Sequence, residues 1–359
     1  MPTAKVHRIS AAAPDDVSGI EAAIARGDIQ PACILAIFGK TEGNGCVNDF
    51  SRGFAVQSLS LLLRGHLGAA ADEVCLVMSG GTEGGMAPHW LVFERSEDES
   101  GPTPALAIGR AHTAGLRPED LGRMGQVEQV ADAVRRAMVA AGISDPQEVH
   151  FVQVKCPLLT AARVAEAQAR GATVATSDTL KSMGLSRGAS ALGIALALGE
   201  VPPGALSDGV ICADLNLWSG RASCSSGIEL MGHEVVVLGM SHAWSGPLAI
   251  AHGVMADAID IAPVQAALAR LGIQLPHRSR EAAERIIVLG KAEASRSGAI
   301  RGHRHTMLDD SDISSTRHAR AFVAGALAGV VGHTEIYVSG GAEHQGPDGG
   351  GPVALIVPR

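Results

Sequence analysis

Lysine, arginine and serine recur in the same order three times along the chain, and these three residue types together can carry out chemistry. A serine hydroxyl becomes a strong nucleophile only when a base removes its proton, and a lysine of lowered pKa can be that base. Arginine stays charged and can hold and polarise a carbonyl oxygen. The pattern predicts attack on a carbonyl in a ligand of threefold symmetry. The sets are Lys40, Arg52 and Ser79; Lys155, Arg187 and Ser225; and Lys291, Arg317 and Ser339.

Glycines follow the serines of the first and third sets, at Gly80 and Gly340. Backbone N–H groups there can approach a ligand oxygen closely, as an oxyanion hole requires. The second set has SSG where the others have SGG, so Ser225 and Ser226 are both candidate nucleophiles. Each of the three serines lies four residues before a glutamate, and alignment on Glu229 selects Ser225.

The three lysines differ in the residue two positions later. Lys40 and Lys291 have a glutamate there, Glu42 and Glu293, whereas Lys155 has a proline. Residues two apart share one face of a strand, so the glutamates are expected to keep their lysines protonated. Lys155 is therefore predicted to be the neutral lysine, which favours the second set as the reactive one.

Each lysine ends an apolar, strand-like run, as do Ser79 and Ser339, and each arginine begins a helix-like stretch after a hydroxyl residue. The repeat of roughly 110–140 residues is too long for a solenoid and suits domain-sized copies. We predict an α+β fold of three homologous α/β repeat units around a pseudo-threefold axis, with the sheets packed centrally and the site between the units. The expected units are residues 1–100, 105–247 and 250–359.

A purely structural interpretation competes with this one. Ser51, Ser186 and Thr316, which precede the arginines, could be helix N-caps, and the SGG segments could be turns. Recurrence of three residue types in one order favours a site. A non-catalytic protein that binds a small symmetric anion through its arginines remains a second hypothesis.

Composition narrows the class of protein. The 359 residues carry a formal charge of −8, which argues against nucleic-acid or anionic-membrane surfaces. The apolar runs fall short of the roughly 20 residues that span a bilayer, and the N-terminus has no apolar core of signal-peptide length. The six cysteines include no CxxC pair and are expected to be reduced. We expect a cytoplasmic enzyme.

Several long runs resemble the cyanuric acid hydrolase/barbiturase family of cyclic amide hydrolases. The resemblance covers essentially the whole chain and is closest to the cyanuric acid branch. It implies one chain of three similar units that opens planar cyclic ureides to carboxylates, with cyanuric acid as substrate and barbituric acid as the alternative. The runs are GKTEGNGCVNDFSR, VMSGGTEG, VQVKCPLLT, SMGLSRGASALGIALA, GKAEAS, STRHARA and YVSGGAEHQGPDGGGP.

The resemblance also implies roles for single residues. Ser225 would be the nucleophile and Lys155 its general base, while arginines hold the three carbonyl oxygens. The segment before Arg317, with Ile313, would set the preference between the two rings. The implied substrate-binding residues are Arg52, Arg187, Arg317, Ser79, Gly80, Ser225, Ser226, Ser339, Gly340, Lys40 and Lys291.

The family further implies a structural divalent metal near the C-terminus, and no catalytic cofactor. One carboxylate with carbonyl and amide oxygens suits a hard cation such as Mg²⁺ or Ca²⁺. We also expect a homo-oligomer, for example a tetramer. The implied metal-site residues are Glu293, Ala342, Gln345, Gly346, Pro347 and Gly350.

Overall fold

Three four-stranded sheets of one topology form the molecule in a computed structural model that describes residues 1–97, 101–274 and 280–359. In each sheet the second and third strands along the chain are parallel, and the other pairs are antiparallel. The strand orders are β1-β4-β2-β3, β5-β8-β6-β7 and β9-β14-β10-β13. The strands are β1 (Thr3–Ser10), β2 (Ile34–Thr41), β3 (Cys75–Gly80), β4 (His89–Ser96), β5 (Ala105–His112), β6 (Val149–Pro157), β7 (Ala222–Gly227), β8 (Glu234–Ser241), β9 (Leu248–Met255), β10 (Ile287–Ala292), β13 (Tyr337–Gly340) and β14 (Gly351–Pro358).

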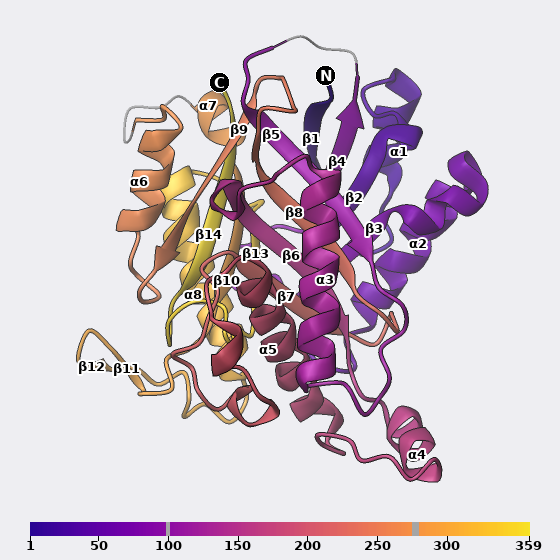
Figure 1. Ribbon diagram of the computed structural model, residues 1–359. Helices are drawn as coiled ribbons and strands as arrows, with labels where there is room; N and C mark the ends of the chain where they lie inside the picture. Colours follow the sequence, from indigo (N-terminus) through magenta and orange to yellow (C-terminus); the bar gives the residue numbers. More distant parts are fainter. Residues whose placement is uncertain (98–100, 275–279) are drawn as a thin grey trace.

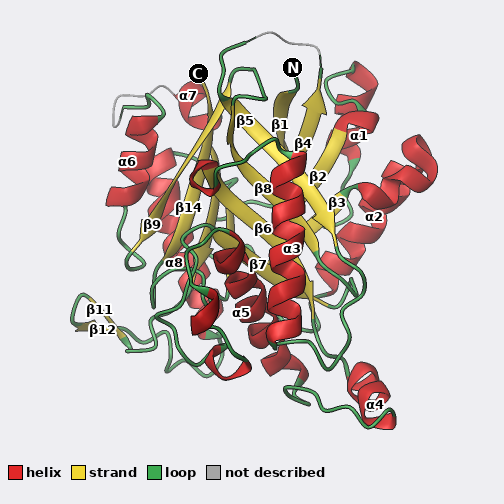
Figure 2. Cartoon of the chain, in the orientation of Figure 1, coloured by secondary structure: helices red, strands yellow, loops and turns green. Residues whose placement is uncertain are grey.

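Helices lie outside the sheets, as Figures 1 and 2 show. In each unit, the helix between the parallel strands packs on both of them: α2 on β2 and β3, α5 on β6 and β7, and α8 on β10 and β13. Within the described ranges, no helix is long and apolar enough to cross a membrane. The helices are α1 (Ser18–Arg26), α2 (Phe50–Leu67), α3 (Met124–Ala140), α4 (Ala161–Ala169), α5 (Thr179–Ala197), α6 (Ala262–Arg270), α7 (Arg280–Glu284) and α8 (Ser315–Val331); a short ribbon joins β11 (Ala299–Ile300) to β12 (His303–Arg304).

One hydrophobic core takes side chains from all three sheets. Phe38 of β2 packs on Phe93 of β4 with ring centroids 4.6 Å apart, and on Tyr337 of β13 at 5.6 Å. Phe151 of β6 and Leu289 of β10 belong to the same buried cluster. Separate clusters fill the space between the outer sheet faces and the helices. Apolar side chains on both faces of a strand explain why the strand sequences are continuously hydrophobic rather than alternating.

In the second sheet, α3 packs very closely on β5. A Cβ at Gly109 of β5 would lie 1.9 Å from the carbonyl oxygen of Ala137 in α3. Only glycine fits there, because the helix backbone occupies the space that a side chain would need.

The first strand of each unit was missing from the predicted order of elements. β1, β5 and β9 carry charged or histidine side chains among their apolar residues, so their pattern is weak. β9 begins at Leu248, ahead of the expected start of the third unit at residue 250. β1 contacts β5, and β5 contacts β9. β3, β7 and β13 each contact the other two. A pseudo-threefold arrangement requires such pairwise contacts.

Candidate active site

Strand pairing places each lysine beside its serine. In the three parallel pairs, Lys40 is the register partner of Ser79, Lys155 of Ser225, and Lys291 of Ser339. Residues in register on adjacent strands point to the same side of the sheet. Three sheets with the same register therefore bring the sequence-predicted lysines and serines together as three matching pairs.

The lysines lie in the protein interior, with exposed fractions of 0% for Lys40, 0% for Lys155 and 1% for Lys291. Burial disfavours a charged amine and so lowers the pKa of each of them. The neighbouring Arg320 adds to this effect at Lys40, whose pKa falls well below its usual value. Burial and the nearby Arg187 lower the pKa of Lys291 to about 7.

Two of the lysines are hydrogen-bonded to their serines. Lys40 Nζ donates to Ser79 Oγ at 3.2 Å, and Lys291 Nζ donates to Ser339 Oγ at the same distance of 3.2 Å. Lys155 Nζ instead donates to the carbonyl oxygen of Met78 at 2.6 Å, across the boundary between the first two units. Three pairs that match in sequence thus differ in their hydrogen bonds.

The expectation that Lys155 lacks a carboxylate partner was wrong. Its Nζ lies 2.7 Å from Oε1 of Glu229, which is 6% exposed. Glu42 is exposed, so it does not serve Lys40 as the sequence spacing suggested. The partner of Lys155 follows the adjacent strand β7 rather than its own strand. Glu229 raises the pKa of Lys155 against the larger effect of burial, which lowers it.

Two of the predicted arginines line the same small cavity as the serines. Arg52, the third residue of α2, donates from Nη1 to the carbonyl oxygen of Ser226 at 2.9 Å. Arg187 of α5 donates from Nε and Nη2 to Glu343, at 2.8 and 2.7 Å, and from Nη1 to Ser226 Oγ at 3.3 Å. These hydrogen bonds fix the orientation of both guanidinium groups.

The third arginine of the cavity is Arg320 and not Arg317. Arg317 stays at the start of α8, where it contacts Ser314 Oγ at 3.4 Å and the carbonyl oxygen of Asp312 at 3.2 Å. Arg320 lies one turn further, is 4% exposed and donates from Nε to Glu83 at 2.9 Å. Arg52 is the third residue of α2, whereas Arg320 is the sixth residue of α8. Matching the arginines by their distance from the helix start therefore selected Arg317, the third residue of α8. Arg320 is distinguished by its ion pair with Glu83 of the first unit, which spacing along the sequence does not reveal.

The inner cavity combines hydroxyl groups, backbone and the three guanidinium groups. Of the predicted substrate-binding and specificity residues, the three lysines and Ile313 do not line the inner cavity. The lysines are buried next to the serines that do line it, and Ile313 is 42% exposed on the segment before α8. A wider cavity of about 400 Å³ adjoins it and is lined in part by Lys181, Arg296 and Arg317. The inner cavity is lined by Gly45, Arg52, Ser79, Gly80, Met183, Arg187, Ser225, Ser226, Arg320, Ser339 and Gly340.

Ser225 differs from the other two serines of the set. It is 7% exposed, against 2% for Ser79 and 2% for Ser339. Within the described part of the chain, its hydroxyl makes no hydrogen bond, while lysines occupy those of Ser79 and Ser339. A nucleophile must reach its target, and Ser225 has the most accessible and least committed hydroxyl of the three.

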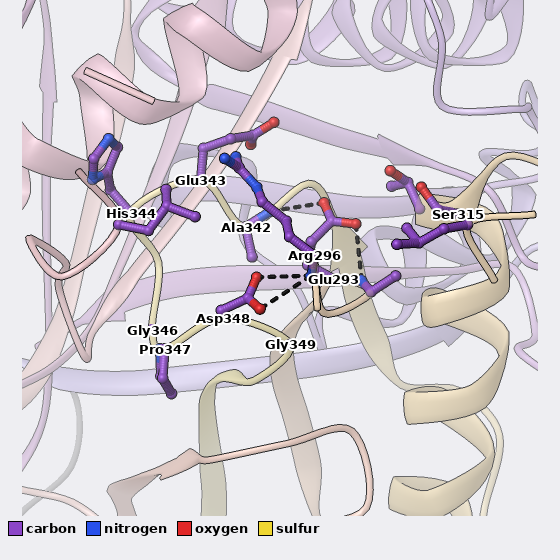
Figure 3. A pocket seen from close by; sticks show the side chains of 14 residues that line it. Glu293, Arg296, Ser315, Ala342, Glu343, His344, Gly346, Pro347, Asp348 and Gly349 are labelled. Carbon is purple, nitrogen blue, oxygen red and sulfur yellow. Dashed lines mark hydrogen bonds between the residues drawn. The ribbon is translucent and has the colours of Figure 1, made fainter. Parts of the chain in front are cut away.

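Four of the six predicted metal-site residues gather in a cavity beside this region (Figure 3), and Gln345 and Gly350 do not line it. Glu293 lines a cavity of about 220 Å³ together with Ala342, Gly346 and Pro347. Its carboxylate accepts hydrogen bonds from the backbone of Ala294 at 3.0 Å and of Ala342 at 3.3 Å. Burial, followed by the nearby Glu343, raises the pKa of Glu293.

The oxygen atoms of the predicted metal-site residues suit a hard cation, but only one of these residues, Glu293, carries a negative charge. Among the described residues, no cluster of three or more histidine, cysteine, aspartate or glutamate side chains could hold a metal. The amide oxygen of Gln345 already accepts the backbone N–H of Cys224 at 2.6 Å. A cation would therefore rest on Glu293 and on carbonyl oxygens, as Ca²⁺ and Mg²⁺ allow.

Comparisons with known proteins agree with this geometry. Residues 5–358 match the family model described as amidohydrolase ring-opening protein. A cyanuric acid amidohydrolase of Azorhizobium caulinodans is 79% identical, covering 100% of this chain and 99% of the relative, and one of Bradyrhizobium sp. is 60% identical, covering 100% of both. The solved structure of the A. caulinodans cyanuric acid hydrolase matches over 100% of both chains with a TM-score of 0.95. The chain therefore belongs to the family of ring-opening amidohydrolases.

Proposed function

We propose that this protein is a cyanuric acid amidohydrolase, which opens the ring of cyanuric acid to carboxybiuret. The observation that carries the proposal is the threefold set of lysine–serine pairs and arginines around one cavity. Cyanuric acid has three equivalent carbonyl groups and three N–H groups, so it matches such a set. Relatives 79% and 60% identical over the full chain bear the same name.

Ser225 is the proposed nucleophile. Lys155, as the neutral amine, takes the hydroxyl proton while the oxygen attacks a ring carbonyl carbon. The arginines hold the carbonyl oxygens, and they stabilise the negative charge on the tetrahedral intermediate together with backbone donors beside the serines. The accessible hydroxyl of Ser225 supports this assignment over Ser79 and Ser339.

The second half of the reaction reverses the proton transfer. The protonated Lys155 gives its proton to the departing ring nitrogen, which opens the ring and leaves an acyl-enzyme. Water then hydrolyses the ester, and the product carboxybiuret loses carbon dioxide to give biuret. Lys40 and Lys291 keep their hydrogen bonds to Ser79 and Ser339 and so hold these two hydroxyl groups in place for binding.

A structural divalent cation, a homo-oligomer and a cytoplasmic location are parts of the same proposal. Glu293 and the carbonyl oxygens around it would hold the cation, which would brace the loop after β13 and would supply no catalytic step. Exposed apolar side chains along α2 support an oligomer: Phe50 is 84% exposed, Phe54 50% and Leu61 64%.

The test is an assay of the purified protein with cyanuric acid and with barbituric acid, following loss of the ring and release of carbon dioxide. We expect turnover of cyanuric acid. Turnover that favours barbituric acid would make the protein a barbiturase. Binding of either ring without product, in protein that has not lost its fold, would favour the non-catalytic binder.

A further inference from the structure

The glutamate four residues after each serine has a partner in another unit in two of the three cases. Glu83 of the first unit accepts hydrogen bonds from Arg320 of the third, at 2.9 Å from its Nε. Glu343 of the third unit accepts two from Arg187 of the second, at 2.8 and 2.7 Å. Continued around the molecule, this order would pair Glu229 of the second unit with Arg52 of the first.

The third pair is not formed in this way. Arg52 donates to the carbonyl oxygen of Ser226 at 2.9 Å, and its Nε lies 3.8 Å from the buried carboxylate of Asp49, the N-cap of α2. With Asp49 near its arginine, Glu229 forms its ion pair with Lys155 instead, at 2.7 Å. In the part of the chain that the structure describes, Lys155 thus differs from the other two lysines in having an ion pair with the glutamate of its own unit.

Given the proposed role of Lys155 as the base, we propose that Glu229 is the positioning residue that makes Lys155 the lysine that transfers protons. The ion pair holds the amine of Lys155, the register partner of Ser225, and preserves its basicity in the interior. Lys40 has no such partner among the described residues, and its pKa falls well below the usual value. Lys291, whose pKa is about 7, forms no such ion pair among the described residues either, and both lysines donate to their own serines at 3.2 Å.

Other groups that face Lys155 do not replace this carboxylate. Arg52 of α2 carries the same charge as the lysine, and Cys156 follows it on β6 with a pKa raised by burial. Glu234 of β8 lies opposite Lys155 in register and accepts the backbone N–H of Leu76 at 2.8 Å. Burial raises the pKa of Glu234 to about 8, so this carboxyl is mostly neutral near pH 7.

The experiment is the pH dependence of kcat/KM in Glu229→Gln, with Glu234→Gln as the matched control on the other side of the same lysine. Loss of the Glu229 charge destabilises the ammonium form of Lys155, so the acidic limb of the profile should move down by about 1–3 pH units. We expect kcat to fall with little change in KM. Glu234→Gln should leave the limb in place below pH 7. Ionisation of the substrate adds the same limb to every variant and cancels in the comparison.

An acidic limb in Glu229→Gln that coincides with the wild-type limb overturns the proposal. Should that variant fail to fold, Glu229→Asp decides: its shorter side chain weakens the ion pair, and an unmoved limb there overturns the proposal as well. The base assignment fails by a different result, namely full activity of Lys155→Arg. The two failures are therefore distinguishable.

Discussion

Arg320 and Arg317 make opposite predictions for the same conservative substitution. Lysine keeps the charge but has one compact ammonium group, so it cannot contact Glu83 and a ring carbonyl oxygen in the way that a guanidinium fork can. Arg320 is 4% exposed and lines the inner cavity, whereas Arg317 is bound to its own helix start. Arg320→Lys should therefore impair the enzyme, and Arg317→Lys should leave it close to wild type.

The size of the effect is set by the lost contact. A hydrogen bond to a charged group contributes about 1.5–3 kcal/mol. At about 1.4 kcal/mol for each factor of ten, the expected loss in kcat/KM for Arg320→Lys is roughly 10- to 150-fold. Stability should fall by up to about 1–3 kcal/mol, since Arg320 is 4% exposed and lysine replaces its paired contact with Glu83 poorly.

Steady-state kinetics with cyanuric acid measure the effect, and thermal unfolding of both variants controls for loss of fold. For Arg317→Lys we expect kcat/KM within about threefold of wild type, because a surface change far from buried contacts costs about 0.5 kcal/mol or less. A larger loss in Arg317→Lys than in Arg320→Lys would refute the placement of the third arginine.

Four further outcomes are expected. Ser225→Ala should lose several orders of magnitude in kcat while Ser226→Ala retains substantial turnover, and the reverse order would show that the second repeat is aligned wrongly. Lys155→Arg should bind substrate and be nearly inactive in the same kinetic assay, because arginine does not lose its proton near neutral pH. Barbituric acid should be a competitive inhibitor or a substrate poorer by roughly 5- to 150-fold, since its CH₂ leaves one polar group of the site unpaired at about 1–3 kcal/mol; a higher kcat/KM than for cyanuric acid would contradict this. Burial lowers the pKa of His150 to about 3 and of His252 to about 4, and their Nδ1 atoms lie 2.8 Å apart. The free energy of unfolding should therefore be highest above about pH 6.5 and fall toward pH 4 by up to about 1.4 kcal/mol per pH unit for each histidine. Chemical denaturation of His252→Gln should show a weaker dependence on pH.

The sequence by itself determined the repeat, the kind of unit and most of the lysine and serine positions. Lys40 and Ser79 each end a continuous apolar run, and such runs are recognisable because buried strands are apolar on both faces. Equal spacing of functional residues from the strand ends then brought them into register. The first strand of each unit was missed; β1, with Lys5 and His7, shows why, because its mixed pattern weakens the signal.

Only the tertiary structure decided which charges meet. Arg320 was chosen over Arg317 by Glu83, and Lys155 gained Glu229, although both pairs join segments that are distant along the chain. Spacing within one strand or one helix carries information about neighbours on the same element. It carries none about Lys155 and Glu229, whose segments meet only when β6 and β7 pair, or about Arg320 and Glu83, which depend on how three separately formed sheets pack together.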